Sequence, residues 1–431
     1  MSSVLPRVCL VVLALCLLAG PALAQSPPLS AAAAVAEALA ANVALHAERE
    51  AAAVPFEKPA QERFLMPPMF EAQIWQWPVT TLNPANVNMY MFMVEQAYPG
   101  RGKRAAREAL ALREAEAGLA AVPVMERDLA LAVRMAWSDL AAARRVRGVF
   151  DETLAALTSL GEASTARYAA ASGGQQDVLR NIVEIANVRR DLISVEERAR
   201  LAEVRLATLL GRSPGARIGP LAEPTRPLAT LDAAQLATTA VAARPEVAAL
   251  DSERRRIDAA LAAITSDRRP DWVVGGGYML MPGEAGAWTA RAGLTWPRAP
   301  WSKGRFNAQV REQEATLRAI EARLADLRQQ ISASVHEAVV AVDAARARVA
   351  LLRDGVRPQA RQAIEVARIG YQTGGVEFID VLDSFRSSLS VDTEIVDAEA
   401  DVWRAEAALE RALGVPLAEV PRTAAAARGE Q

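Results

Sequence analysis

Short segments of alternating apolar and polar residues occur at four places in the chain. In the clearest one, residues 288–296, every second residue is apolar and the residues between are polar or small, with Trp288 and Trp296 at the ends of the apolar set. In a β-strand, such alternation places one set on each face, and an apolar face with terminal aromatics is typical of a membrane-barrel strand facing lipid. The pattern also predicts strands at residues 69–77, 88–95 and 271–280.

Each predicted strand pair is followed by a very long stretch rich in Ala, Leu, Arg and Glu. These stretches cover residues 104–171 and 305–373, and as helices each would be on the order of 100 Å long. Paired glycines end both of them. Shorter helices are expected at residues 177–210, 233–264 and 380–413. Two half-length helices placed end to end match one long helix, so the fold class is mainly α with a small β part.

The chain also contains an internal duplication. Tyr168 precedes Asp177 by nine residues, and Tyr371 precedes Asp380 by the same nine, with Val-Leu after each aspartate. The two copies lie 203 residues apart, and a Leu-Gly pair downstream of each keeps that offset. Such a period is far longer than that of a solenoid, so a whole structural unit is duplicated.

These observations define the domain organisation that we expect. Two tandem repeats, residues 25–232 and 233–431, form one structural domain, with a Pro/Gly-rich linker at 212–227 and a C-terminal tail. Four strands cannot close a barrel alone, and an open sheet edge cannot face lipid. A membrane barrel built from this chain therefore needs several copies of it.

The first 24 residues have the features of a secretory signal peptide. A basic residue precedes an apolar core at 8–19, and a small-x-small cleavage site follows at 22–24. Both cysteines, Cys9 and Cys16, lie inside this segment, so the exported chain is expected to have no thiol. Leu15 stands where a lipoprotein would need a small residue, so lipidation is not expected.

Composition excludes several classes of function. Lys+Arg number 49 and Asp+Glu 51, a balance that argues against a nucleic-acid partner. The two histidines, His46 and His336, lie at opposite ends of the chain, so a multi-histidine metal site is not expected. Residues 211–215 fit the G-x-S-x-G elbow of a hydrolase around Ser213, but that motif needs a strand before it and a helix after it. We predict no cofactor and no enzymatic activity.

With these features, the chain resembles the TolC-like outer-membrane efflux factor family from about Ala31 to Leu417. The resemblance rests on the repeated Tyr…Gly…Asp-Val-Leu block, the Gly-Lys/Arg step after the strands, and the Leu-Gly helix ends. It implies a homotrimer with a 12-stranded transmembrane β-barrel, to which each chain contributes four strands, above a long α-helical coiled-coil barrel in the periplasm. The segments 89–93 and 99–104 are similar to the heavy-metal efflux branch.

The resemblance also implies a function and partners. The chain would be the outer-membrane channel of a tripartite efflux system, docked through a periplasmic adaptor (membrane fusion) protein onto an inner-membrane pump of RND type. It would be a passive duct for metal cations or small toxic compounds, located in the Gram-negative outer membrane with a large periplasmic portion. The duct of a type I protein secretion system and a periplasmic helical scaffold remain as alternatives.

Asp380 and Asp383 are the candidates for a periplasmic gate. They lie three residues apart at the start of a helix, on one face, and match aspartates that constrict the entrance in the family. Rings of packed carboxylates attract cations. Acidic residues in a first helical turn also complement the helix dipole, so this structural explanation stays open beside the gate.

A latch on the gate is implied at Tyr371, which resembles a family tyrosine that hydrogen-bonds an acid on a neighbouring hairpin, here Asp177. Simple packing of Tyr371 between helices is the alternative. The family's basic companion would fall at Val376, which has no polar side chain. Arg180 takes the place of the second acid in the first repeat, and either an ion pair or solvation is possible for it.

The paired glycines are expected at the two hairpin tips, where positive φ is needed. In the family these tips contact the adaptor. The four residues are Gly173, Gly174, Gly374 and Gly375.

Methionines gather in or beside the predicted strands. Met89, Met91 and Met93 share one face of their strand, and thioether sulfur is a ligand for soft ions such as Cu(I). Methionine is also an ordinary gap-filling apolar residue. Metal contact by these three residues is therefore a speculative prediction, and packing is the alternative.

Overall fold

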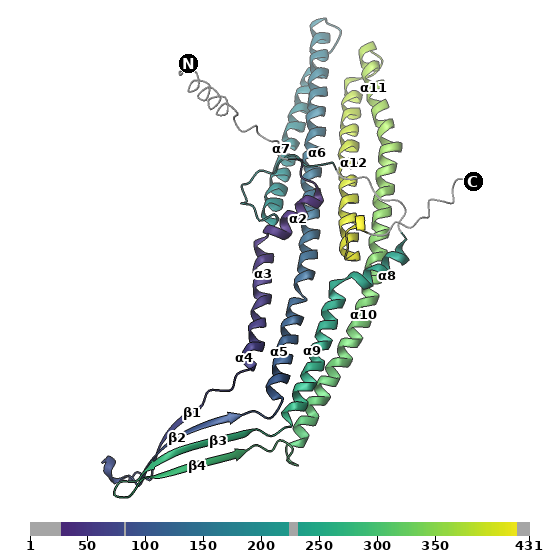
Figure 1. Cartoon of the computed structure of the whole chain (residues 1–431). Coiled ribbons are helices and arrows are strands. Elements are labelled where there is room, and N and C mark those ends of the chain that lie inside the picture. The colour runs from purple at the N-terminus through teal and green to yellow at the C-terminus, as the bar shows by residue number, and fades with distance from the viewer. Residues whose placement is uncertain (1–26, 82, 224–231, 420–431) are drawn as a thin grey trace, which may run out of the picture.

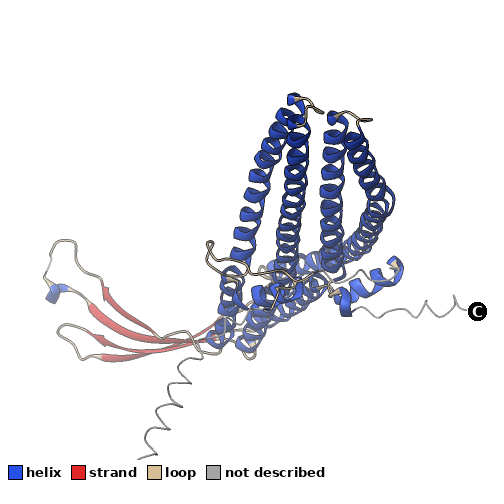
Figure 2. Cartoon of the chain, turned by 90° about the horizontal axis from the view of Figure 1, so that it is seen from above, coloured by secondary structure: helices blue, strands red, loops and turns tan. Residues whose placement is uncertain are grey.

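The computed structural model describes residues 27–81, 83–223 and 232–419. The expected signal peptide, both cysteines and most of the C-terminal tail lie outside these residues. Long helices stand side by side in an elongated body, and a small sheet projects from one end of it (Figure 1). In the view turned by 90° about the horizontal axis, the strands extend away from one end of the helices (Figure 2).

Each repeat contributes one group of helices. Those of the first repeat are α2 (Ala31–Ala41), α3 (Val43–Ala53), η1 (Val54–Glu57), α4 (Lys58–Glu62), α5 (Lys103–Leu119), α6 (Val122–Ala169) and α7 (Gln175–Leu209). Those of the second repeat are α8 (Ala233–Ala243), α9 (Pro245–Asp267), α10 (Lys303–Ala350), the π-helical turn η3 (Leu351–Val356), α11 (Arg357–Thr373) and α12 (Phe378–Leu413).

Three helices predicted to be continuous are interrupted, and a proline explains each interruption. The stretch 104–171 divides into α5 and α6, with Pro123 in the first turn of α6. The stretch 233–264 divides at Arg244, before Pro245. The stretch 305–373 changes to π-helical geometry at η3, which ends two residues before Pro358. Proline lacks the N–H for the helical ladder and clashes with the preceding turn, so each helix restarts around it.

The four predicted strands are present and form one antiparallel sheet. They are β1 (Met69–Trp75), β2 (Met89–Tyr98), β3 (Trp272–Leu280) and β4 (Ala287–Leu294), paired in the order β1-β2-β3-β4. The central pairing of β2 with β3 joins the two repeats. Strands β1 and β4 are left as the two open edges.

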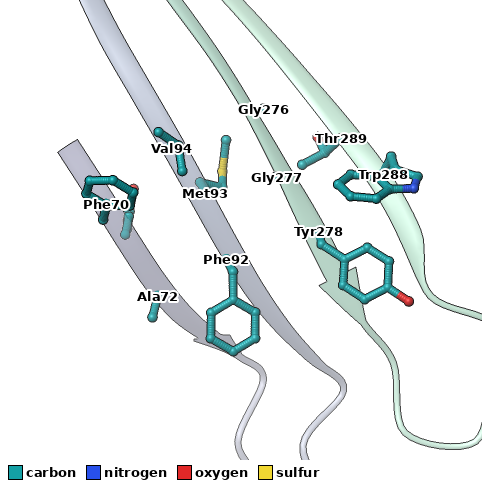
Figure 3. A pocket seen from close by; sticks show the side chains of 11 residues that line it. Phe70, Ala72, Phe92, Met93, Val94, Gly276, Gly277, Tyr278, Trp288 and Thr289 are labelled. Atoms are coloured by element: carbon teal, nitrogen blue, oxygen red, sulfur yellow. The ribbon is translucent and has the colours of Figure 1, made fainter. Parts of the chain in front are cut away.

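The sheet has one apolar and one polar face. Phe70, Phe92, Tyr278 and Trp288 project from the four strands on the apolar face (Figure 3). Because side chains alternate along a strand, Glu71, the methionines of β2, Glu95 and Arg291 lie on the other face. This agrees with the alternation of a barrel strand that turns its apolar side to lipid.

The upper helices form a layer in the order α7, α6, α12, α11 (Figure 1). Its core includes Leu157, Val188 and Leu382, so both repeats contribute to it. Lower in the layer, Trp137 of α6 meets Trp403 of α12 edge to face, with ring centroids 6.0 Å apart. The two repeats therefore pack as one structural unit.

Within the described part of the chain, no helix combines the length and apolar character that crossing a membrane would need.

Candidate functional site

The free ends of the helical layer are two hairpin tips, one between α6 and α7 and one between α11 and α12 (Figure 1). Of the four tip glycines, only Gly374 has a positive φ, at 79°. In the first tip the left-handed residue is Ala171, with φ 53°, whereas Gly174 is extended. The expectation of positive φ at all four glycines is therefore wrong. A single left-handed residue is sufficient to end the first helix of each hairpin.

Another glycine is required by close approach in the second tip. A Cβ placed on Gly370 would lie 2.4 Å from Cγ2 of Val376. The backbone N–H of Gly375 donates to the carbonyl oxygen of Gly370 at 2.8 Å, which closes the turn. Val376, which stands where the family has a basic residue, thus packs against Gly370. The missing side chain of Gly370 leaves room for the valine.

Tyr371 lies between the two hairpins. Its Oη donates a hydrogen bond of 3.2 Å to Oδ2 of Asp177 at the start of α7. The side chain is buried, and its ring meets Phe378 of α12 edge to face at 5.2 Å. Burial, and then the negative charge of Asp177, raises the pKa of the Tyr371 hydroxyl above its usual 10.0. The hydroxyl therefore remains a hydrogen-bond donor at physiological pH.

Arg167 completes this group, and sequence reasoning missed it. Its guanidinium lies 4.3 Å from the centroid of the Tyr371 ring and donates to the carbonyl oxygen of Tyr371. The first repeat thus holds Tyr371 by a cation–π contact and by two hydrogen bonds, from Arg167 and to Asp177. The duplication gave no signal for it, because the matching position in the second repeat, 203 residues later, is Gly370.

A second contact between the hairpins lies further from the tip. Arg386 of α12 forms two hydrogen bonds with Glu184 of α7, at 3.0 and 2.5 Å, and the carboxylate of Glu184 is buried. Asp383 accepts a third bond from the same guanidinium at 3.0 Å. The pKa of Arg386 is raised, first by its hydrogen bond to Glu184. Asp383 is therefore a partly neutralised carboxylate beside the inter-hairpin ion pair.

The predicted gate residues differ in their surroundings. Asp380 is exposed in the first turn of α12, and in the described part of the chain its carboxylate has no hydrogen-bond or ion-pair partner. Arg180 likewise makes no ion pair within the described ranges. The structure brings Tyr371 and Asp177 together and leaves Asp380 available to a solute or to another chain.

The methionines of β2 lie on the polar face of the sheet. Met91 is directly opposite Met279 of β3, and Met89 and Met93 flank it on the same face, partly exposed. Among the described residues, no group of three His, Cys, Asp or Glu side chains is placed to hold a metal ion. Thioether sulfur is thus the soft donor on this face of the sheet.

The segment around Ser213 is not a nucleophile elbow. Gly211 follows the end of α7 rather than a strand, and residues 213–223 continue as turns and extended chain rather than as a helix. The hydrolase alternative therefore lacks its structural context.

The comparisons with known proteins agree with this geometry. Residues 236–415 match the model of the family described as outer membrane efflux protein. Among solved structures, CusC aligns with a TM-score of 0.72 at 15% identity, over 89% of this chain and 92% of CusC. VceC from Vibrio cholerae aligns with a TM-score of 0.69 at 20% identity, over 90% of this chain and 96% of VceC. Residues 236–415 are therefore similar in sequence to outer membrane efflux proteins.

A further similar structure is the outer-membrane channel MtrE of Neisseria gonorrhoeae in its open state, with a TM-score of 0.69 at 19% identity over 89% of this chain and 88% of MtrE. No curated protein matches the chain in sequence. The chain therefore has the fold of the TolC-like outer-membrane channels.

Proposed function

We propose that the chain forms a homotrimeric, passive export duct that joins the periplasm to the exterior. The observation that carries the proposal is the sheet, which has an apolar aromatic face and two unpaired edges, β1 and β4. Unpaired backbone groups at the edges are costly in lipid, so β4 of one copy has to pair with β1 of the next until the ring closes. Three copies supply the twelve strands implied by the family resemblance.

The helical layer supports the same assembly, because its edges carry complementary surfaces. Along the free side of α7, Leu179, Ile182 and Val183 are exposed. At the opposite edge, Val366 lines an open hollow of about 570 Å³ between α11 and α12. The hollow is lined by both apolar and polar side chains, and an apolar stripe opposite a partly apolar hollow fits a head-to-tail ring of identical copies.

The gate would lie at the hairpin tips. In a ring, Asp380 and Asp383 would form two levels of carboxylates, and the contacts of Tyr371 with Asp177 and Arg167 would hold the second hairpin against the first. Opening then requires α11 and α12 to move away from α6 and α7. A periplasmic adaptor that binds the tips around Gly173, Gly174, Gly374 and Gly375 would favour the separated state. An inner-membrane pump of RND type would supply the energy.

The cargo that we propose is a metal cation or a small toxic compound. The methionine face favours soft cations, because thioethers bind Cu(I) and Ag(I) in preference to hard ions. A deletion strain, with and without complementation, should be tested for growth on copper, silver, zinc, cobalt, dyes and detergents. Sensitivity confined to soft metals would support the methionine site. Sensitivity to dyes and detergents alone would indicate that Met89, Met91 and Met93 are packing residues rather than metal ligands.

The assembly has its own test. The duct predicts trimers in the outer-membrane fraction that resist detergent and dissociate on heating, together with discrete conductance steps in planar bilayers. A periplasmic scaffold would instead be found in the soluble fraction, without conductance. Loss of secretion of a protein in the deletion strain, with unchanged resistance to metals and dyes, would favour the type I secretion alternative.

A further inference from the structure

The charged side chains of the strands are all on one face of the sheet. Strands β1 to β4 contain three such residues, which are Glu71, Glu95 and Arg291. The register places Glu71 opposite Met93, and places Glu95 and Arg291 in one row across the sheet with Gly275 between them. In a closed barrel with its apolar face toward lipid, this face is the lumen.

Glu95 and Arg291 form an ion pair that passes over a whole strand. Nη1 of Arg291 donates to Oε1 of Glu95 at 2.7 Å, although β3 separates the two strands that carry them. The Glu95 side chain is only 9% exposed, whereas that of Arg291 is 61% exposed. Glu95 therefore lies along the sheet surface, and the guanidinium is the part of the pair that meets the aqueous space.

Gly275 makes this pair possible. A Cβ on Gly275 would lie 2.8 Å from Cγ of Glu95, so any side chain there would displace the carboxylate arm. The neighbouring Gly276 points to the other face, and its Cβ would meet nothing closer than the Thr289 carbonyl oxygen at 3.6 Å. There the missing side chain leaves a hollow of about 500 Å³ between Phe92 and Trp288 (Figure 3). The two adjacent glycines thus have different roles, one of which is to accommodate the ion pair.

We propose that Glu95 and Arg291, aligned across Gly275, form a paired-charge ring that sets the charge selectivity of the lumen, with Glu71 adding a net negative charge in each chain. The proposal rests on the proposed barrel. Rings of charged side chains determine which ions enter a pore. Within one chain Glu71 has no ion-pair partner among the described residues, so this face of the strands carries one more carboxylate than guanidinium per chain. The outer part of the duct therefore favours cations.

The test is the reversal potential of the purified full-length protein in planar bilayers across a KCl gradient. Wild type is expected to be cation-favouring. Glu95→Gln leaves Arg291 unpaired and should shift the reversal potential toward anions, whereas Arg291→Gln should shift it the opposite way. The double variant Glu95→Gln with Arg291→Gln keeps the net charge and should return close to wild type. Equal reversal potentials for wild type and both single variants would overturn the proposal.

A second measurement tests directly which face of the sheet lines the lumen, by the charge of a reagent attached at a chosen position. Both cysteines of the chain, Cys9 and Cys16, lie in the expected signal peptide, so in the processed chain a single introduced thiol can be modified selectively. In Arg291→Cys, cationic and anionic thiol reagents should change the conductance in opposite directions. In Ala290→Cys, on the lipid-facing side, they should leave it unchanged. Equal responses at the two positions would overturn the lumen assignment, whereas the complete absence of channels in wild type would contradict the proposed duct itself.

Discussion

The hydroxyl of Tyr371 and the carboxylate of Asp177 form a 3.2 Å hydrogen bond between residues that are 194 positions apart in the chain. Each residue belongs to a different repeat and to a different hairpin, so the bond is a direct measure of whether the two hairpin tips are together. Arg167 covers the tyrosine ring at 4.3 Å and adds a second attachment at the same place. The tip contact is therefore a small group of three residues that a change at one position can weaken selectively.

Tyr371→Phe removes the hydroxyl and keeps the ring in its packing site. A hydrogen bond to a charged acceptor contributes about 1.5–3 kcal/mol, so the tips should separate more readily and the open-channel conductance or open probability should rise. Tyr168→Phe is the matched control, because Tyr168 is the half-exposed counterpart in the first repeat. Identical single-channel records for Tyr371→Phe and wild type would show that the bond does not restrain the tips.

The tip contact should also depend on pH at the alkaline side. The folded-state pKa of Tyr371 is raised above 10.0, so its contribution to stability is complete below pH 10 and is lost as the pH rises through the folded value. Channel records between pH 8 and pH 11 should show opening above pH 10 in wild type. Tyr371→Phe should lack that component. An equal pH response in wild type and Tyr371→Phe would mean that groups other than the Tyr371 hydroxyl cause the response.

Asp380→Asn should affect ion passage more than Asp383→Asn does. The carboxylate of Asp380 has no partner in the described part of the chain, whereas Asp383 is bonded to Arg386 at 3.0 Å. Removing the unpaired charge should weaken block by multivalent cations and raise conductance, and removing both should do so further. Glu365→Gln, an exposed acid on α11 that pairs with Arg368, is the control. Unchanged block in the double variant would remove the gate assignment.

Glu246 should stabilise the protein at neutral pH and lose this effect in acid. Burial raises its pKa, but the hydrogen bonds from Arg244 and the ion pair with Arg411 outweigh burial and lower the pKa from 4.5 to about 2. The lowered value corresponds to on the order of 3 kcal/mol, present above pH 4.5 and lost as the pH falls toward 2. Glu246→Gln should lower the unfolding temperature at pH 7 and much less at pH 3.

The control for Glu246 lies on the same helix. Glu253 pairs with Arg256 at the surface, where both side chains are about one-third exposed, and such pairs contribute about 0–1 kcal/mol. Glu253→Gln should therefore leave the unfolding temperature nearly unchanged at both pH values. Equal effects of the two substitutions would mean that burial of Glu246 does not strengthen its ion pairs.

Gly211→Ala should be strongly destabilising. Gly211 has φ 72°, and a Cβ there would lie 2.2 Å from the carbonyl oxygen of Ala41 at the end of α2. Left-handed strain alone costs about 1–2 kcal/mol, and the clash adds to it. Gly215→Ala is the control, because nothing lies within 4 Å of its Cβ position and its φ is not in the left-handed region. Similar unfolding temperatures for the two variants would contradict the close approach of α2 and α7.

Much of the fold could be predicted because its signals are local. The alternation around Trp288 and Trp296 identified β4, and similar patterns identified the other three strands, with ends that differ from the structure by at most three residues. The proline interruptions were visible at Pro123, Pro245 and Pro358, but the long apolar periodicity continues through them. A break of one or two residues changes the direction of a helix without changing its pattern, so the structure was needed to show where each helix restarts.

The candidate site was predictable only where the two repeats match. Tyr371 and Asp177 were found because each has a counterpart in the other repeat. Arg167, Glu184 and Arg386 were missed, since none of them repeats across the duplication. A contact between non-equivalent positions leaves no periodic signal.

By itself, the sequence determined the strands, most of the helices and the duplication, because these follow from the geometry of the backbone and from how neighbouring residues alternate. The tertiary structure decided which side chains meet across the duplication. In the folded chain Arg167 stacks on Tyr371, and Glu184 pairs with Arg386. The side chain of Glu95 lies across Gly275 and accepts a hydrogen bond from Arg291. These contacts depend on the angle and register at which the two repeats pack, and the spacing of residues along one chain does not encode either.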